Sequence, residues 1–172
     1  MCVTLAELNR LDAAAFVDEL GAVFEHSPWV AGRAYDRRPF GSVGELHQAM
    51  MSAVRAASAA EQLALVRAHP ELAGVEAREG TLTAHSSGEQ ARLGLTALSR
   101  DEFRRIGELN RRYREKFGFP CIVALKLHAS RDSVLGEMER RLANDADAEL
   151  RAALEQIGHI TRGRLVQMFG TN

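Results

Sequence analysis

Apolar residues recur along most of the chain at the 3.6-residue spacing of helices that bury one face. Between residues 12 and 23, for example, Phe16, Leu20 and Val23 follow this period. Ser27 followed by Pro28 indicates another helix start, with the serine as N-cap and the proline at the first helical position. Further helices are predicted at roughly 43–57, 59–68, 87–97, 100–117, 131–143 and 146–168. The pattern predicts an all-α fold, a single-domain helical bundle.

Hydroxyl and carboxylate residues at the spacing of a capping box mark five of the predicted helix starts. In this motif a serine or threonine and the glutamate three residues later each satisfy a backbone N–H group that the first helical turn cannot pair internally. The five pairs are Thr4/Glu7, Ser42/Glu45, Ser58/Glu61, Ser86/Glu89 and Ser99/Glu102. We therefore expect a helix to begin at each of these positions.

Two segments lack the helical pattern. Residues 73–87 contain Gly74 and Gly80 and no sustained apolar period, so we expect a surface loop there. Residues 117–128 carry Gly118 and Pro120 and then a short apolar run. Because no second strand is evident to pair with this run, we expect one buried, extended apolar connection near residues 118–128.

Length and composition fit one globular domain that covers residues 1–172. A chain of 172 residues can bury most of the apolar surface that it exposes when unfolded. Hydrophobic residues at 46% and charged residues at 26% exclude a disordered or coiled-coil chain. With 22 basic and 23 acidic residues, the net charge of −1 gives no general field that attracts nucleic acid or anionic lipid. We expect a small-molecule partner, with no nucleic acid and no membrane.

The cysteines and the missing signals favour the cytoplasm. Cys2 and Cys121 are too isolated to form a disulfide framework or a CxxC site. No segment resembles a secretory signal, and no apolar run approaches the roughly 18 residues of a membrane-spanning helix.

The sequence lacks several common motifs of metal, nucleotide and serine-nucleophile sites. They are HExxH and related metal-ligand spacings, glycine-rich phosphate loops and the GxSxG serine motif. We expect a cytoplasmic protein without a bound metal.

His69 differs in context from the other histidines. It ends a predicted helix directly before Pro70, which disfavours the α conformation for the residue preceding it, so the chain should leave the helix there. One interpretation is structural, because a cationic ring interacts favourably with a helix C-terminus. The other interpretation is catalytic. The remaining histidines have ordinary places within predicted helices or near their ends: His26, His47, His85, His128 and His159.

A second candidate group lies at the predicted helix start SSGEQ, residues 86–90. Glu89 has a structural explanation as the carboxylate of a capping box that reaches back to the backbone of Ser86. The same helix start would gather N–H groups and hydroxyls suited to an anion or a ureido carbonyl. In the final helix, Arg162 and Arg164 are further candidates, and the pattern does not choose between them.

Five segments together resemble one family, the 2-oxo-4-hydroxy-4-carboxy-5-ureidoimidazoline (OHCU) decarboxylases of purine breakdown. They occur in the family's order and span nearly the whole chain: FEHSPWVA (24–31), HPELAG (69–74), LTAHSSGEQ (82–90), LNRRYREKFGFP (109–120) and HITRGRL (159–165). The resemblance implies an all-helical, cofactor-free enzyme, usually a homodimer, that decarboxylates OHCU to (S)-allantoin in urate breakdown.

The resemblance also implies roles for individual residues. His69 matches the family's acid/base, Glu89 the residue that assists it, and Arg164 the arginine of the terminal motif. The positions that match the family's substrate-binding residues are Pro70, Ser86, Ser87, Gln90, Phe119, Cys121, Ile122, Val123 and Ala124. The chain departs from the family pattern at one position: the family often has an aromatic residue after FGFP, whereas this chain has Cys121. The smaller side chain leaves more room in the expected pocket.

Decarboxylation suits these residue types. Loss of carbon dioxide leaves electron density on a ring carbon conjugated to a C=N or carbonyl group, so donors such as Arg164 and the N–H groups near Ser86 would stabilise the transition state. A proton must then reach one face of that carbon, which suits an imidazole such as that of His69. The unsaturated ring itself delocalises the charge, so no electron-sink cofactor is required. The alternatives are a non-catalytic helical binding module of the same fold and a decarboxylase of a related ureido-imidazoline.

Overall fold

The chain is helical throughout its described part. A computed structural model describes residues 3–170, so Cys2 lies outside the described residues. The α-helices are α1 (Leu5–Leu8), α2 (Ala13–Leu20), α3 (Trp29–Ala34), α4 (Val43–Ala56), α5 (Ala59–Arg67), α6 (Val75–Glu79), α7 (Ala84–Arg92), α8 (Arg100–Phe117), α9 (Arg131–Arg141) and α10 (Ala146–Phe169). Short 3₁₀ helices are η1 (Gly21–Phe24), η2 (Tyr35–Arg37) and η3 (Leu125–Leu127). No strand occurs within residues 3–170, which confirms the predicted all-α class.

The chain divides into two compact units. The first holds the chain up to Leu65 and again from Gly158, and the second holds Val66–Ile157. Helix α10 therefore contributes its residues before Gly158 to the second unit and its remaining residues to the first. Whether the two units act as a single domain over residues 1–172 stays a prediction.

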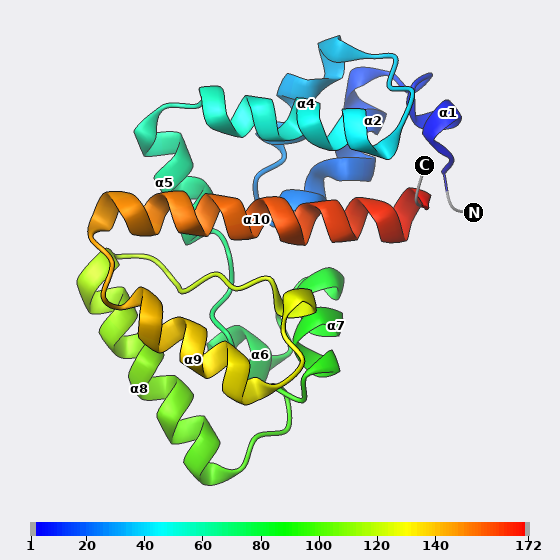
Figure 1. The fold of residues 1–172 in the computed structure, drawn as a ribbon. Coiled ribbons are helices and arrows are strands. Elements are labelled where there is room, and N and C mark those ends of the chain that lie inside the picture. The colour runs from blue at the N-terminus through cyan, green and yellow to red at the C-terminus, as the bar shows by residue number, and fades with distance from the viewer. Residues whose placement is uncertain (1–2, 171–172) are drawn as a thin grey trace. The chain divides into compact units, whose positions relative to one another are not determined.

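The first unit has an apolar core built by α2, α3 and α4, the blue to cyan helices of Figure 1. Phe16 lies at its centre, with its ring edge-on to Tyr35 at 5.5 Å and stacked on Phe40 at 6.3 Å between ring centroids. The side-chain amide of Asn9 holds the backbone of Phe40 from both sides, with a donated and an accepted hydrogen bond of 2.9 Å each. This amide closes the turn that leads into α4.

The second unit is organised around α8 and α9, which run side by side in Figure 1. Its interior contains a polar cluster as well as apolar side chains. Arg141 and Glu149 are almost completely buried and form an ion pair of 2.5 Å, and the hydroxyl of Tyr113 donates to the same carboxylate. Asn144 donates to the second carboxylate oxygen at 2.8 Å. Buried charges are tolerated when they are paired and hydrogen-bonded in this way.

Most of the predicted helix starts are confirmed. The reciprocal capping bonds form at Thr4, Ser58 and Ser99. At Ser42 the hydroxyl accepts from the N–H of Glu45 as expected, but the carboxylate of Glu45 accepts from Gly41 instead. The first helix of the pattern ends as η1, and α3 begins one residue later than predicted, with Pro28 and no side-chain bond at its N-cap.

The predicted capping box at Ser86 and Glu89 is wrong. Thr83 caps α7 instead, and its hydroxyl accepts from the N–H of Ser86 at 3.3 Å. The helix therefore begins three residues earlier than predicted, at Ala84, and ends at Arg92. Thr83 prevails because a threonine side chain can cap as a serine does, and the next residues are compatible with a helix.

The predicted loop at residues 73–87 contains α6, a helix of five residues, as well as the start of α7. Such a short helix leaves no apolar period to detect. The extended connection near residues 118–128 is confirmed: its backbone is non-helical until η3, and Phe119 and residues 121–125 are buried, whereas Leu127 is exposed.

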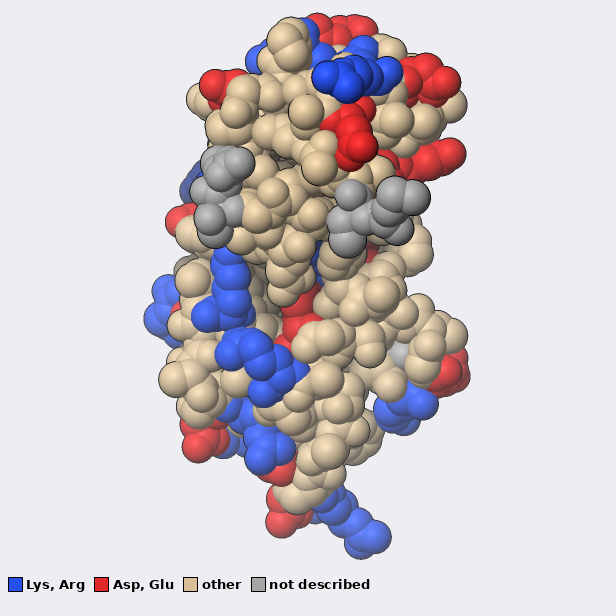
Figure 2. All heavy atoms as spheres, turned by 90° about the vertical axis from the view of Figure 1, so that its right-hand side faces the viewer, with Lys and Arg blue, Asp and Glu red and all other residues tan. Residues whose placement is uncertain are grey.

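The face drawn in Figure 2 shows no separation of charge. Acidic and basic side chains occur close to one another there. Among residues 3–170, no helix combines the length and the apolar composition needed to cross a membrane.

Candidate active site

His69 follows the end of α5 in a non-helical turn, as Pro70 predicts. Helix α5 ends at Arg67, and the N–H of His69 still donates to the carbonyl of Val66 at 3.4 Å before the chain turns away. The His69 residue is 6% exposed and Pro70 is half-buried. This burial argues against a solvated helix-end ring, which is the simplest structural interpretation of the sequence.

Two amide side chains hold the turn that follows His69. Gln90 of α7 accepts from the N–H of Ala73 at 2.8 Å and donates to the carbonyl of Glu71 at 3.2 Å. Asn110 of α8 donates to the carbonyl of Leu72 at 2.9 Å. Three successive residues of the turn therefore have a backbone group bound by a side chain. Both amide residues are themselves buried.

The candidate residues of α7 have different surroundings. Ser86 and Gln90 are one helical turn apart and both buried, Glu89 is half-buried, and Ser87 is exposed. The N–H of Ser86 is bound to the hydroxyl of Thr83, and the N–H of Ser87 donates to its carbonyl at 2.9 Å. The expectation that these N–H groups form an anion site is therefore wrong, because the helix and its cap already use them.

Along the apolar connection, side chains form the hydrogen bonds to the backbone that a neighbouring strand would form in a sheet. Phe119, Cys121, Ile122, Val123 and Ala124 are all buried. Arg67 donates to the carbonyl of Gly118 at 3.0 Å, and Arg141 donates to that of Ile122 at 2.5 Å. The N–H of Ala124 donates to Gln156 at 2.9 Å, and Arg92 donates to the carbonyl of Leu125. A buried backbone needs such partners when no ladder is present.

Burial also sets the state of the thiol in this connection. It raises the pKa of Cys121 to about 12, so the side chain is a neutral thiol at physiological pH. Cys121 therefore contributes a small apolar surface where the family often has an aromatic ring.

Arg164 lies in the first unit, and Glu25 and Val23 are among its partners. Its Nη2 atom lies 2.7 Å from Oε1 of Glu25, and both side chains are at most 2% exposed. Its Nη1 donates to the carbonyl of Val23 at 3.1 Å. Glu25 has a φ of 52°, a left-handed value that costs a non-glycine residue about 1–3 kcal/mol. Sequence reasoning missed Glu25, although it belongs to the FEHSPWVA segment.

Arg162, the alternative to Arg164, has different surroundings. The residue is half-buried, and its buried Nη1 atom has no hydrogen-bond partner among the described residues. Nearby, the ring of the half-buried His47 is hydrogen-bonded at 3.1 Å to the hydroxyl of Thr161.

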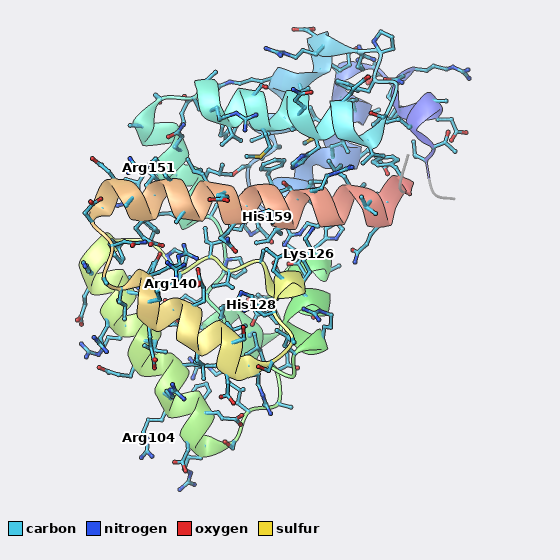
Figure 3. All side chains as sticks on the ribbon, viewed as in Figure 1. Arg104, Lys126, His128, Arg140, Arg151 and His159 are labelled. Carbon is cyan, nitrogen blue, oxygen red and sulfur yellow. The ribbon has the colours of Figure 1, made fainter. Side chains whose placement is uncertain are left out.

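Two other histidines, His128 and His159, have ordinary surroundings. Figure 3 shows His128 in the segment after η3 and His159 on α10. Nδ1 of His128 lies 2.7 Å from the hydroxyl of Ser133, and His159 is exposed. Within the part of the chain that the structure describes, no group of three or more His, Cys, Asp or Glu residues could hold a metal ion.

The structure thus brings the His69 turn, Gln90 and Asn110 together in the second unit, and Arg164 and Glu25 together in the first. The first group contains a histidine that can exchange protons, next to a helix that carries Glu89. The second contains a fixed guanidinium that can oppose negative charge.

Comparisons with known proteins agree on one family. The sequence profile described as OHCU decarboxylase matches residues 9–166. A 2-oxo-4-hydroxy-4-carboxy-5-ureidoimidazoline decarboxylase of Haloferax volcanii is 44% identical over 98% of both chains. A protein of the same name from Mus musculus is 36% identical over 98% of this chain and 94% of that protein. A solved (S)-allantoin synthase is 27% identical with a TM-score of 0.75, and the match covers 97% of this chain and 54% of that one.

Proposed function

This chain belongs to the OHCU decarboxylase family, and on that premise we propose that it converts OHCU to (S)-allantoin as a carboxy-lyase of urate breakdown. The observation that carries the proposal is similarity along nearly the full length of the chain, which includes both units and all five family segments. A binding module that had lost its chemistry would be free to lose the histidine, glutamate and arginine of those segments, and this chain retains all three.

The reaction needs a place for an electron pair and a source of one proton. The bond between C4 and its carboxylate breaks, carbon dioxide leaves, and the electron pair moves into the ring toward the C=N nitrogen. That nitrogen takes up a proton, a second proton is added to C5, and the C4 hydroxyl loses its proton to become the ring carbonyl, so the reaction takes up one proton overall. The conjugated ring holds the charge between these steps, so we propose that the enzyme uses no cofactor.

We propose His69 as the acid/base that handles the proton, with Glu89 orienting its ring. Two observations support this proposal. His69 is buried in a turn that is hydrogen-bonded by the side chains of Gln90 and Asn110, and Glu89 is the residue directly before Gln90 on α7. A proton donor must keep its position during the reaction, and a turn that is hydrogen-bonded from two helices meets that requirement.

Arg164 is proposed to oppose the negative charge that develops on the ring. Its contacts with Glu25 and Val23 fix the direction of the guanidinium, as a preorganised donor requires. Arg162 has no comparable pair of contacts among those that the structure gives.

Substrate binding is proposed for the remaining family positions. They are Pro70, Ser86, Ser87, Gln90, Phe119, Cys121, Ile122, Val123 and Ala124. The buried connection supports this assignment, because side chains from several helices hold its backbone in place beside a small thiol. We also propose that the protein is a homodimer in the cytoplasm and that neither nucleic acid nor membrane is its partner.

The direct test mixes the purified protein with freshly generated OHCU and follows the circular dichroism of the product. We expect a rapid signal of one sign from (S)-allantoin, against the slow racemic background without enzyme. Binding without turnover would indicate the binding module, and turnover of a different ureido-imidazoline alone would indicate the related decarboxylase. Light scattering of the same sample tests the homodimer.

A further inference from the structure

Asn110 has a buried contact that the proposed chemistry does not use. It belongs to the LNRRYREKFGFP segment, lies on α8 and is 5% exposed. Its Nδ2 donates to the carbonyl of Leu72 at 2.9 Å, whereas its Oδ1 has no hydrogen-bond partner among the described residues. The bond to Leu72 is therefore the polar contact through which Asn110 acts on the rest of the unit.

The turn that receives this bond has one backbone hydrogen bond of its own, from the N–H of Gly74 to the carbonyl of Glu71 at 3.3 Å. Residues 69–74 lie between α5 and α6 without a helix of their own. Ala73 has a φ of 51°, in the left-handed region, which costs an L-residue conformational free energy. The bonds from Gln90 to Glu71 and Ala73, and from Asn110 to Leu72, oppose that cost. An ion pair between Arg114 and Glu71 adds a further link to α8.

A shift at Leu72 would reach His69, because Pro70 between them has a ring that locks φ and stiffens the chain. We propose that Asn110, together with Gln90, is a positioning residue that fixes the His69 turn against α7 and α8. We call the two side chains the amide clamp. This inference rests on the proposed function, in which His69 handles the proton.

The decisive variant is Asn110→Leu, which keeps the approximate volume and removes the donor to Leu72. Asn9→Leu is the matched control, because Asn9 holds the backbone of Phe40 through two hydrogen bonds of 2.9 Å in the other unit. Both variants lose a buried or half-buried amide, so both should melt at a lower temperature. The amide clamp predicts that only Asn110→Leu loses turnover.

We expect kcat of folded Asn110→Leu to fall about 10²-fold, the size of effect that a displaced catalytic group produces, with a much smaller change in KM. Hydrogen exchange followed by mass spectrometry should show faster exchange in the peptide containing residues 69–75. In Asn9→Leu, neither kcat nor exchange of that peptide should change. Unchanged turnover in Asn110→Leu, or an equal loss in both variants, would overturn the proposal.

Gln90→Glu provides a second variant if Asn110→Leu does not fold. It keeps an acceptor for the N–H of Ala73 and loses the donor to the carbonyl of Glu71, so exchange in residues 69–75 should again rise. Exchange as slow as in the unmodified protein would contradict the amide clamp. If the unmodified protein does not turn over OHCU, the proposed function fails, and hydrogen exchange still decides whether the clamp holds the turn.

Discussion

Nη2 of Arg164 and Oε1 of Glu25 lie 2.7 Å apart, and both side chains are almost completely buried. Each charge is therefore compensated by the other in surroundings where water does not solvate it. Glu25 keeps this contact although its backbone has an unfavourable positive φ of 52°. The pair makes Glu25 a determinant of where the guanidinium of Arg164 points.

Glu25→Gln should destabilise the protein by about 3–5 kcal/mol, because removing one partner leaves a buried charge uncompensated. Glu139→Gln is the control, since Glu139 pairs with Arg105 on the surface, where solvent screens the pair and it contributes little to stability. Urea unfolding of both variants measures the difference. Equal effects would mean that the buried pair has no special role in stability.

His69→Asn should lower turnover by roughly 10²–10⁴-fold, the usual loss when a general acid/base is removed. Asparagine keeps some hydrogen bonding and the approximate shape, so inhibitor affinity should change much less. His159→Asn, on the exposed face of α10, serves as control. Near-normal turnover with a lowered melting temperature would return His69 to the role of a helix terminator.

Arg164→Lys and Arg162→Lys separate the two arginines of the terminal motif. Lysine keeps the positive charge and loses the planar fork, so it cannot reproduce the contacts of Arg164 with Glu25 and Val23. We expect the larger loss of kcat/KM in Arg164→Lys. The reverse order, measured on folded protein, would transfer the catalytic role to Arg162.

Dialysis against a chelator should leave turnover unchanged. The substrate ring delocalises the electron pair released with carbon dioxide, so the reaction as proposed has no step that needs a metal. The measurement compares initial rates before and after dialysis. A loss that one divalent cation restores would contradict the proposal of a metal-free reaction.

Cys121 should make stability fall as the pH rises above about 9. Burial raises the pKa of its thiol from 9.0 to about 12, so between these values the unfolded chain releases a proton that the native chain keeps. The unfolded state then binds fewer protons, and the free energy of unfolding decreases by up to about 1.4 kcal/mol per pH unit. Cys121→Ala should remove this part of the slope, measured by urea unfolding from pH 8 to about pH 10. Identical slopes in the two proteins would exclude a buried thiol.

Local signals in the sequence predicted most helices and their starts. Thr4, Ser58 and Ser99 act within three residues of their partners, so spacing alone reveals their capping role. The same reasoning failed at Ser86 because two hydroxyl residues competed, and Thr83 caps α7 instead. The extended connection was predictable from its breakers and its short apolar run.

The residues that support the site could not be predicted in the same way. Glu25 pairs with Arg164, and Asn110 binds the carbonyl of Leu72, across long stretches of sequence. Neither contact leaves a periodic pattern, because each depends on how distant helices pack. Family resemblance marks both segments, since Glu25 lies in FEHSPWVA and Asn110 in LNRRYREKFGFP, but it assigned neither residue a role.

The buried connection has a consequence for how the chain avoids self-association. CIVAL, residues 121–125, is rich in β-forming residues and uncharged, the composition of segments that template cross-β aggregates. An extended segment of this kind is dangerous when it offers a row of open carbonyl and N–H groups to another molecule. Here side chains bind the backbone groups at three of its residues: Arg141 binds the carbonyl of Ile122, Gln156 the N–H of Ala124 and Arg92 the carbonyl of Leu125. A single side chain, unlike a neighbouring strand, offers no further row of backbone groups to which another strand could bind. These three side chains therefore protect the segment against aggregation as well as holding it in place.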